Sequence, residues 1–185
     1  MQRDLKDQRI LISGASAGLG RALAVELGRR GARLALLARS RTGLDETEAL
    51  ARKAGAAQTL IIRADVSKPA VRAQVARALR PWSGLDALVN NAGVHAFASV
   101  ADLPEALLKE ALEVNLYGVL RLTQAALPLL RQSQGLIVNI GSTLGYRAIP
   151  NAAAYCASKG ALARFSESLR DEEARHGVAV LHASP

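Results

Sequence analysis

Tyr155 and Lys159 lie four positions apart in a stretch with helical spacing, so both side chains are expected on one face of a helix. A free phenol is almost fully protonated at neutral pH, but a nearby ammonium group favours the phenolate form. Such a tyrosine could act as the acid in carbonyl reduction and as the base in alcohol oxidation. Taken alone, the two residues could equally be a half-buried tyrosine and a solvated helix lysine.

Three glycines, Gly14, Gly18 and Gly20, follow the first apolar run of the chain. Backbone N–H groups beside such glycines can approach a pyrophosphate at the positive end of the next helix. The segment lacks the Gly-Lys-Ser/Thr ending of a P-loop, which argues against a nucleoside triphosphatase. A plain tight turn is the alternative interpretation.

Short apolar runs alternate with stretches of helical spacing along the chain. Strands are expected at 9–13, 33–37, 59–62, 85–89, 135–140 and 178–181, and helices at 18–30, 42–53, 68–79, 104–130 and 155–176. Continuously apolar strands that alternate with helices predict a parallel sheet covered on both faces. We therefore expect one α/β domain over residues 1–185, with a doubly wound, Rossmann-like sheet.

The polar and glycine-rich segments all follow expected strands. They lie at 13–20, 38–41, 64–67, 90–93 and 141–145. Ligands of doubly wound folds bind beyond the carboxyl ends of the strands, where the strand order reverses. These loops are therefore predicted to line one crevice.

Composition excludes several classes of function. The formal charge is +8, but the basic residues are scattered and only 3% of residues are aromatic, which disfavours a nucleic-acid partner. Every apolar run is too short to span a membrane. The single cysteine, Cys156, excludes an intrachain disulfide and favours a reducing compartment, so a cytoplasmic location is expected. No metal-ligand cluster is visible, and the three histidines, His95, His176 and His182, receive no role.

Two further motifs complete a recognisable combination. Asn90-Asn91-Ala92-Gly93 ends the fourth expected strand, and Ser142 lies thirteen positions before Tyr155. Together with the Gly-x-x-x-Gly-x-Gly loop and Tyr-x-x-x-Lys, they make the chain resemble the short-chain dehydrogenase/reductase family from about residue 10 to 185. The resemblance implies an oxidoreductase that transfers a hydride between a nicotinamide cofactor and a small carbonyl or alcohol substrate.

The resemblance also implies the roles of four catalytic residues. Tyr155 moves the proton, and Lys159 assists it and hydrogen-bonds the nicotinamide ribose. Ser142 hydrogen-bonds the substrate oxygen, where negative charge develops. Asn115 kinks its helix and positions a water that passes protons toward the lysine.

A larger set of residues is expected to contact the cofactor. Asp65 would contact the adenine, while Asn90 would join the fourth strand to its neighbours. The full expected set is Gly14, Ser16, Gly18, Leu19, Gly20, Arg39, Asp65, Val66, Asn91, Ala92, Gly93, Tyr155 and Lys159.

The charge after the second strand predicts which cofactor is bound. An acidic residue there would hydrogen-bond the ribose hydroxyls of NAD, whereas an arginine accommodates the 2′-phosphate of NADP. The chain has Arg39 there and no acid until Asp45, so NADP is expected and NAD is less favoured. Arg41 is a second candidate for this role, and a loop arginine in a basic protein is the alternative.

Members of the family normally continue past Pro185 with a threonine-bearing segment, a substrate lid, another helix and a seventh strand. The C-terminal part of the family fold is therefore expected to be absent from this chain. Two hypotheses stay open: an NADP-dependent oxidoreductase, dimeric or tetrameric as a full-length chain, and a truncated nucleotide-binding fragment without turnover. The substrate is not readable, because specificity lies largely in the lid and in the stretches 94–100 and 144–151.

Overall fold

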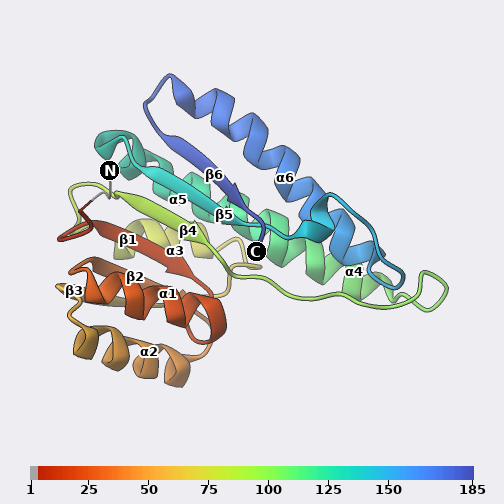
Figure 1. Cartoon of the computed structure of the whole chain (residues 1–185), viewed down its shortest axis with the longest axis horizontal. Coiled ribbons are helices and arrows are strands. Elements are labelled where there is room, and N and C mark those ends of the chain that lie inside the picture. The colour runs from red at the N-terminus through yellow and green to blue at the C-terminus, as the bar shows by residue number, and fades with distance from the viewer. Residues whose placement is uncertain (1–3) are drawn as a thin grey trace.

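The computed structural model describes residues 4–185, which form a six-stranded parallel sheet with the strand order β3-β2-β1-β4-β5-β6 (Figure 1). The order reverses between β1 and β4, which confirms the predicted doubly wound, Rossmann-like fold. The strands are β1 (Arg9–Ser13), β2 (Arg33–Ala38), β3 (Gln58–Arg63), β4 (Ala87–Asn90), β5 (Leu136–Ile140) and β6 (Ala179–Ala183).

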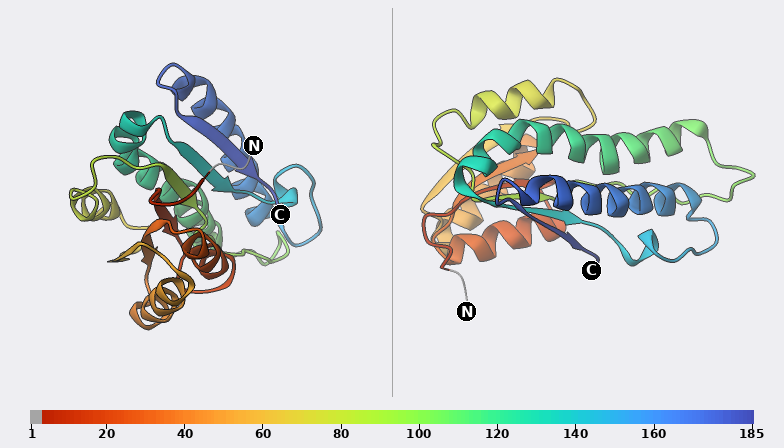
Figure 2. Two further views of the ribbon diagram at one scale, coloured as in Figure 1. Left: turned by 60° about the vertical axis from the view of Figure 1, so that its left-hand side comes forward. Right: turned by 90° about the horizontal axis from the view of Figure 1, so that it is seen from above.

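Helices cover both faces of the sheet, as Figure 2 shows in its view from above. They are α1 (Gly18–Arg29), α2 (Arg41–Ala54), α3 (Val71–Ala78), α4 (Glu105–Leu112), α5 (Gly118–Ser133) and α6 (Ala153–Ala174). Successive side chains of a strand point to opposite faces. In β1, Ile10 and Ile12 accordingly pack in the core beneath α1 and α2, whereas Leu11 packs in the core beneath α3 and α5.

The largest departures from the predicted helix bounds concern α3 and the segment of α4 and α5, whereas the ends of the other helices differ by one or two residues. α3 begins at Val71 rather than at residue 68, because turns occupy the preceding residues. The Asp65 carboxylate there accepts hydrogen bonds from the backbone N–H and the hydroxyl of Ser67, at 2.9 and 2.8 Å. The single helix expected over 104–130 is wrong in detail, since a π-helical turn, Glu113–Tyr117, separates α4 from α5.

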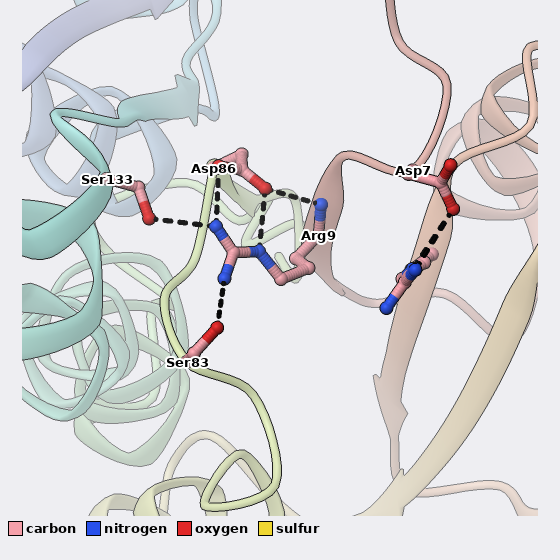
Figure 3. A network of polar contacts seen from close by, with 6 residues as sticks. Asp7, Arg9, Ser83, Asp86 and Ser133 are labelled. Carbon is pink, nitrogen blue, oxygen red and sulfur yellow. Dashed lines mark hydrogen bonds and ion pairs between the residues drawn. The ribbon is translucent and has the colours of Figure 1, made fainter.

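An ion pair fastens the amino ends of β1 and β4, at the edge of the sheet opposite the polar loops (Figure 3). The Arg9 guanidinium donates to both carboxylate oxygens of Asp86, at 2.9 and 3.0 Å. It also donates to the hydroxyls of Ser83 and Ser133, both at 3.1 Å. One side chain thereby joins β1 to the segment before β4 and to the end of α5.

Arg9→Met is expected to lower the free energy of unfolding by about 2 kcal/mol, because it breaks a charged, largely buried hydrogen-bond network. The measurement is urea unfolding followed by circular dichroism. Arg30→Met is the matched control, since Arg30 pairs with Glu26 on the exposed face of α1 and its loss should cost about 0.5 kcal/mol or less. Equal losses in the two variants would contradict the role given to Arg9.

Candidate cofactor and active site

A cleft of about 540 Å³ lies at the carboxyl ends of β1, β2, β3 and β4. Of the five polar loops predicted to line one crevice, four contribute to it. The expected cofactor residues that line it are Gly14, Ser16, Gly18, Leu19, Arg39, Asp65, Val66, Asn91, Ala92 and Gly93. The fifth loop, 141–145, lines a smaller cleft next to it.

The loop between β1 and α1 brings backbone close to the cleft. Gly14 has a φ of +65°, and a Cβ at this position would lie 2.9 Å from Ala92 Cα, so only glycine fits. The Asn91 side chain holds the loop by donating to Ser13 O and Gly14 O, at 3.0 and 3.3 Å. Gly20 lies beneath the loop, where a Cβ would contact Gly14 O, so it packs α1 against the turn.

The N-terminus of α1 suits an anionic ligand. Its N-cap residue, Ala17, makes no side-chain capping hydrogen bond. The first backbone N–H groups of the helix therefore lack the partner that a capping side chain would supply. Gly18 and Leu19 line the cleft at this point, so these donors and the helix dipole fit the pyrophosphate of a dinucleotide.

The larger cleft carries opposite charges, from Arg39 and Asp65. Arg39 lines it, and no hydrogen bond or ion pair occupies its guanidinium within residues 4–185. Arg41, the second candidate, instead pairs with Asp45 at 2.8 Å on the surface of α2. Burial raises the pKa of Asp65, but hydrogen bonds from Ser67 and the charges of Arg39 and Lys68 outweigh it, so the net pKa lies below its ordinary value.

The smaller cleft, of about 220 Å³, brings together Ser142, Tyr155 and Lys159. Lys159 Nζ donates to Ile140 O at 2.8 Å and lies 5.8 Å from the centre of the Tyr155 ring. Burial lowers the pKa of Lys159 from 10.5 to about 8. Ser142 caps a short 3₁₀ turn (Thr143–Gly145), and its hydroxyl accepts a hydrogen bond from Leu144 N at 3.2 Å.

Asn115 does not line either cleft but connects the elements around the smaller one. It is fully buried in the π-helical turn, a distortion that is frequent at functional sites. Its side chain pairs with both backbone groups of Val94, at 2.9 and 3.0 Å, and donates to Ser158 Oγ at 3.0 Å. Ser158 in turn donates to Tyr155 O at 2.8 Å, so Asn115 ties the segment after β4 to the start of α6.

Asn90 joins neighbouring strands, as predicted. Its side-chain amide donates to Asn139 Oδ1 of β5 at 2.8 Å, and Asn139 donates to Ser166 Oγ of α6 at 2.9 Å. This buried chain of polar groups fixes β4 and β5 relative to α6, and thereby the two halves of the site.

His95 received no role in the sequence analysis, although the structure places it at the site. It lines both clefts, together with Asn91, Gly93 and Val94. Its position in the sequence was the available signal. His95 follows the Asn-Asn-Ala-Gly motif by two residues, and the segment that continues from the end of β4 must pass beside the site.

The comparisons with known proteins agree with this geometry. A family model described as short chain dehydrogenase matches residues 8–185. The chain belongs to this family. Members of the short-chain dehydrogenase family bind nicotinamide cofactors.

Three relatives illustrate the likeness. An 11-beta-hydroxysteroid dehydrogenase 1A of Arabidopsis thaliana is 41% identical over 88% of this chain and 47% of its own length. The alcohol dehydrogenase of Thermococcus sibiricus, solved with 5-hydroxy-NADP, has a TM-score of 0.92 and 31% identity over 97% of this chain and 76% of its own. An NAD⁺-bound xylitol dehydrogenase has a TM-score of 0.93 and 32% identity over 99% of this chain and 71% of its own. The chain thus spans about half the length of the first curated relatives.

Within residues 4–185, no group of three or more His, Cys, Asp or Glu side chains could hold a metal ion. No helix in the same range is long and apolar enough to cross a membrane.

Proposed function

We propose that this short-chain dehydrogenase binds NADP(H) in the larger cleft and exchanges a hydride with a small carbonyl or secondary alcohol in the smaller cleft. The observation that carries the proposal is the junction of the two clefts, which share Asn91, Gly93, Val94 and His95. A substrate beside Tyr155 would therefore lie next to the end of a dinucleotide that runs along the glycine loop.

Each residue of the smaller cleft has a separate role in the proton transfer of this reaction. The cofactor, when bound, supplies the hydride that reduces the carbonyl carbon. Tyr155 gives its hydroxyl proton to the carbonyl oxygen, which completes the alcohol, and Ser142 donates a hydrogen bond to that oxygen. Lys159, held against Ile140 O, supplies the positive charge that stabilises the phenolate left behind. Asn115 keeps the segment after β4 in place around them.

The NADP preference rests on the Arg39 guanidinium, which lines the larger cleft and makes no hydrogen bond or ion pair within residues 4–185. Arg39→Asp is expected to weaken NADPH binding by about 10- to 100-fold, because it replaces a charged hydrogen-bond donor to the 2′-phosphate with a repelling carboxylate. The affinity for NADH should stay the same or rise. The measurement is fluorescence titration of both cofactors.

Arg41→Asp is the matched control, since Arg41 is paired with Asp45 and lies two residues further along the chain, at the start of α2. It should change the ratio of the two affinities by about twofold or less. An unchanged preference for NADPH in Arg39→Asp would refute the assignment of NADP to Arg39.

The alternative function, a nucleotide-binding fragment without turnover, predicts a different assay result. Oxidation of NADPH is followed with a panel of ketones and aldehydes, alongside cofactor binding by titration. Turnover supports the oxidoreductase, whereas tight NADPH binding without turnover on any substrate supports the fragment.

A further inference from the structure

Two aromatic rings from the segment after β4 pack on Tyr155. The His95 ring meets the Tyr155 ring edge-on at 5.3 Å between centres, and the Phe97 ring lies 5.6 Å from it at a tilt of 31°. The two rings are also 5.8 Å from each other. These distances are within the range of favourable aromatic contacts, so the three rings form one cluster.

Backbone hydrogen bonds hold this segment at both ends of the cluster. Val94 pairs with the buried Asn115 side chain through both its N–H and its carbonyl. Ala98 N donates to Asn151 O at 2.8 Å, which joins the segment to the loop before α6. Figures 1 and 2 show both segments extending past the end of the sheet. The rings are therefore held in position before a substrate arrives.

The three rings differ in exposure. Tyr155 is only 8% exposed, whereas Phe97 is 50% exposed although it is one of only two phenylalanines in the chain. His95 lines the smaller cleft beside Tyr155, and Phe97 packs on both rings from outside that cleft, so its exposed apolar surface adjoins the Tyr155 ring. A small polar substrate would leave this surface in water, while a flat apolar group attached to the carbonyl would cover it.

On the basis of the reaction proposed above, we propose that His95 and Phe97 form an aromatic wall that selects aryl aldehydes and aryl ketones. The carbonyl lies at Tyr155 and Ser142, and the aryl ring stacks along the wall. An aromatic contact of this kind corresponds to about a tenfold preference over a saturated ring of the same size.

The test compares benzaldehyde with cyclohexanecarbaldehyde, which have the same carbon skeleton. The ratio of their kcat/KM values is measured for the unmodified protein, Phe97→Ala and His95→Ala, so that the intrinsic reactivities of the aldehydes cancel. The ratio should fall about tenfold in Phe97→Ala and several-fold in His95→Ala, and His95→Phe should restore it. Leu50→Ala, which removes a similarly exposed apolar side chain on α2, should leave the ratio unchanged.

A binding measurement keeps the inference separate from catalysis. Benzamide and cyclohexanecarboxamide, which are not reduced, are titrated by NMR in the presence of NADP⁺. Benzamide should bind more tightly to the unmodified protein, and Phe97→Ala should remove the difference. The proposal of an aromatic wall would be refuted if the two amides bound equally well. It would also be refuted if Phe97→Ala and His95→Ala left the ratio of the kcat/KM values for the two aldehydes unchanged. Selective benzamide binding without aldehyde turnover would keep the wall and refute the proposed reaction.

Discussion

Tyr155→Phe should lower kcat/KM for carbonyl reduction by about 10²- to 10⁴-fold, the contribution typical of a positioned general acid. The variant removes one hydroxyl and keeps the ring that packs against His95 and Phe97. Within residues 4–185, that hydroxyl has no hydrogen-bond partner, so the stability of the fold should hardly change. The measurements are steady-state kinetics, NADPH titration and thermal unfolding on the same preparation.

Tyr117→Phe is the control for this experiment, because it removes a hydroxyl from the half-exposed Tyr117 in the π-helical turn. Its turnover should stay within about twofold of the unmodified protein. Substantial turnover by Tyr155→Phe with unchanged NADPH affinity would show that another group supplies the proton, and the proposed mechanism would fail.

Lys159→Met should impair catalysis and stabilise the fold at the same time. Loss of the positive charge beside the phenolate is expected to lower kcat by about 10²- to 10³-fold. Burial of the charged ammonium lowers the pKa of Lys159 from 10.5 to about 8, which corresponds to a cost of about 3 kcal/mol at pH 7. Loss of the hydrogen bond to Ile140 O offsets about 1 kcal/mol, so the variant should gain about 2 kcal/mol of unfolding free energy.

The pH dependence of this gain has a definite sign. The lowered pKa means that the unfolded chain binds the proton more tightly than the folded one, so the stability of the unmodified protein rises with pH through this interval. The cost is fully present below pH about 8 and is relieved between about 8 and 10.5. The advantage of Lys159→Met in urea unfolding should therefore shrink across that window.

Lys109→Met serves as the control, since Lys109 is exposed on α4 and pairs with Glu105. It should change stability by about 0.5 kcal/mol or less at every pH and leave kcat unaffected. If Lys159→Met were less stable than the unmodified protein at pH 7, the cost of burying the ammonium would not be the largest contribution of Lys159 to the free energy of unfolding.

The order of the elements and the location of the site could be predicted from local patterns. The apolar runs at 9–13 and 33–37 are continuous, and only a sheet covered on both faces buries both sides of such strands. Parallel strands place their carboxyl ends at one edge, so the loops after them had to meet there. The family motifs then indicated which residues to expect at the cofactor and which at the reacting groups, but not that the loops would divide between two clefts.

The π-helical turn at Asn115 could not be predicted from helical spacing, because its register depends on contacts with Val94 and Ser158 in other segments. The pairing of Lys159 with Ile140 O and the packing of His95 and Phe97 on Tyr155 likewise join distant parts of the chain. Local periodicity records only which face of an element is buried. Which side chains meet across that face depends on how the whole sheet and its helices pack, so only the tertiary structure decided these contacts.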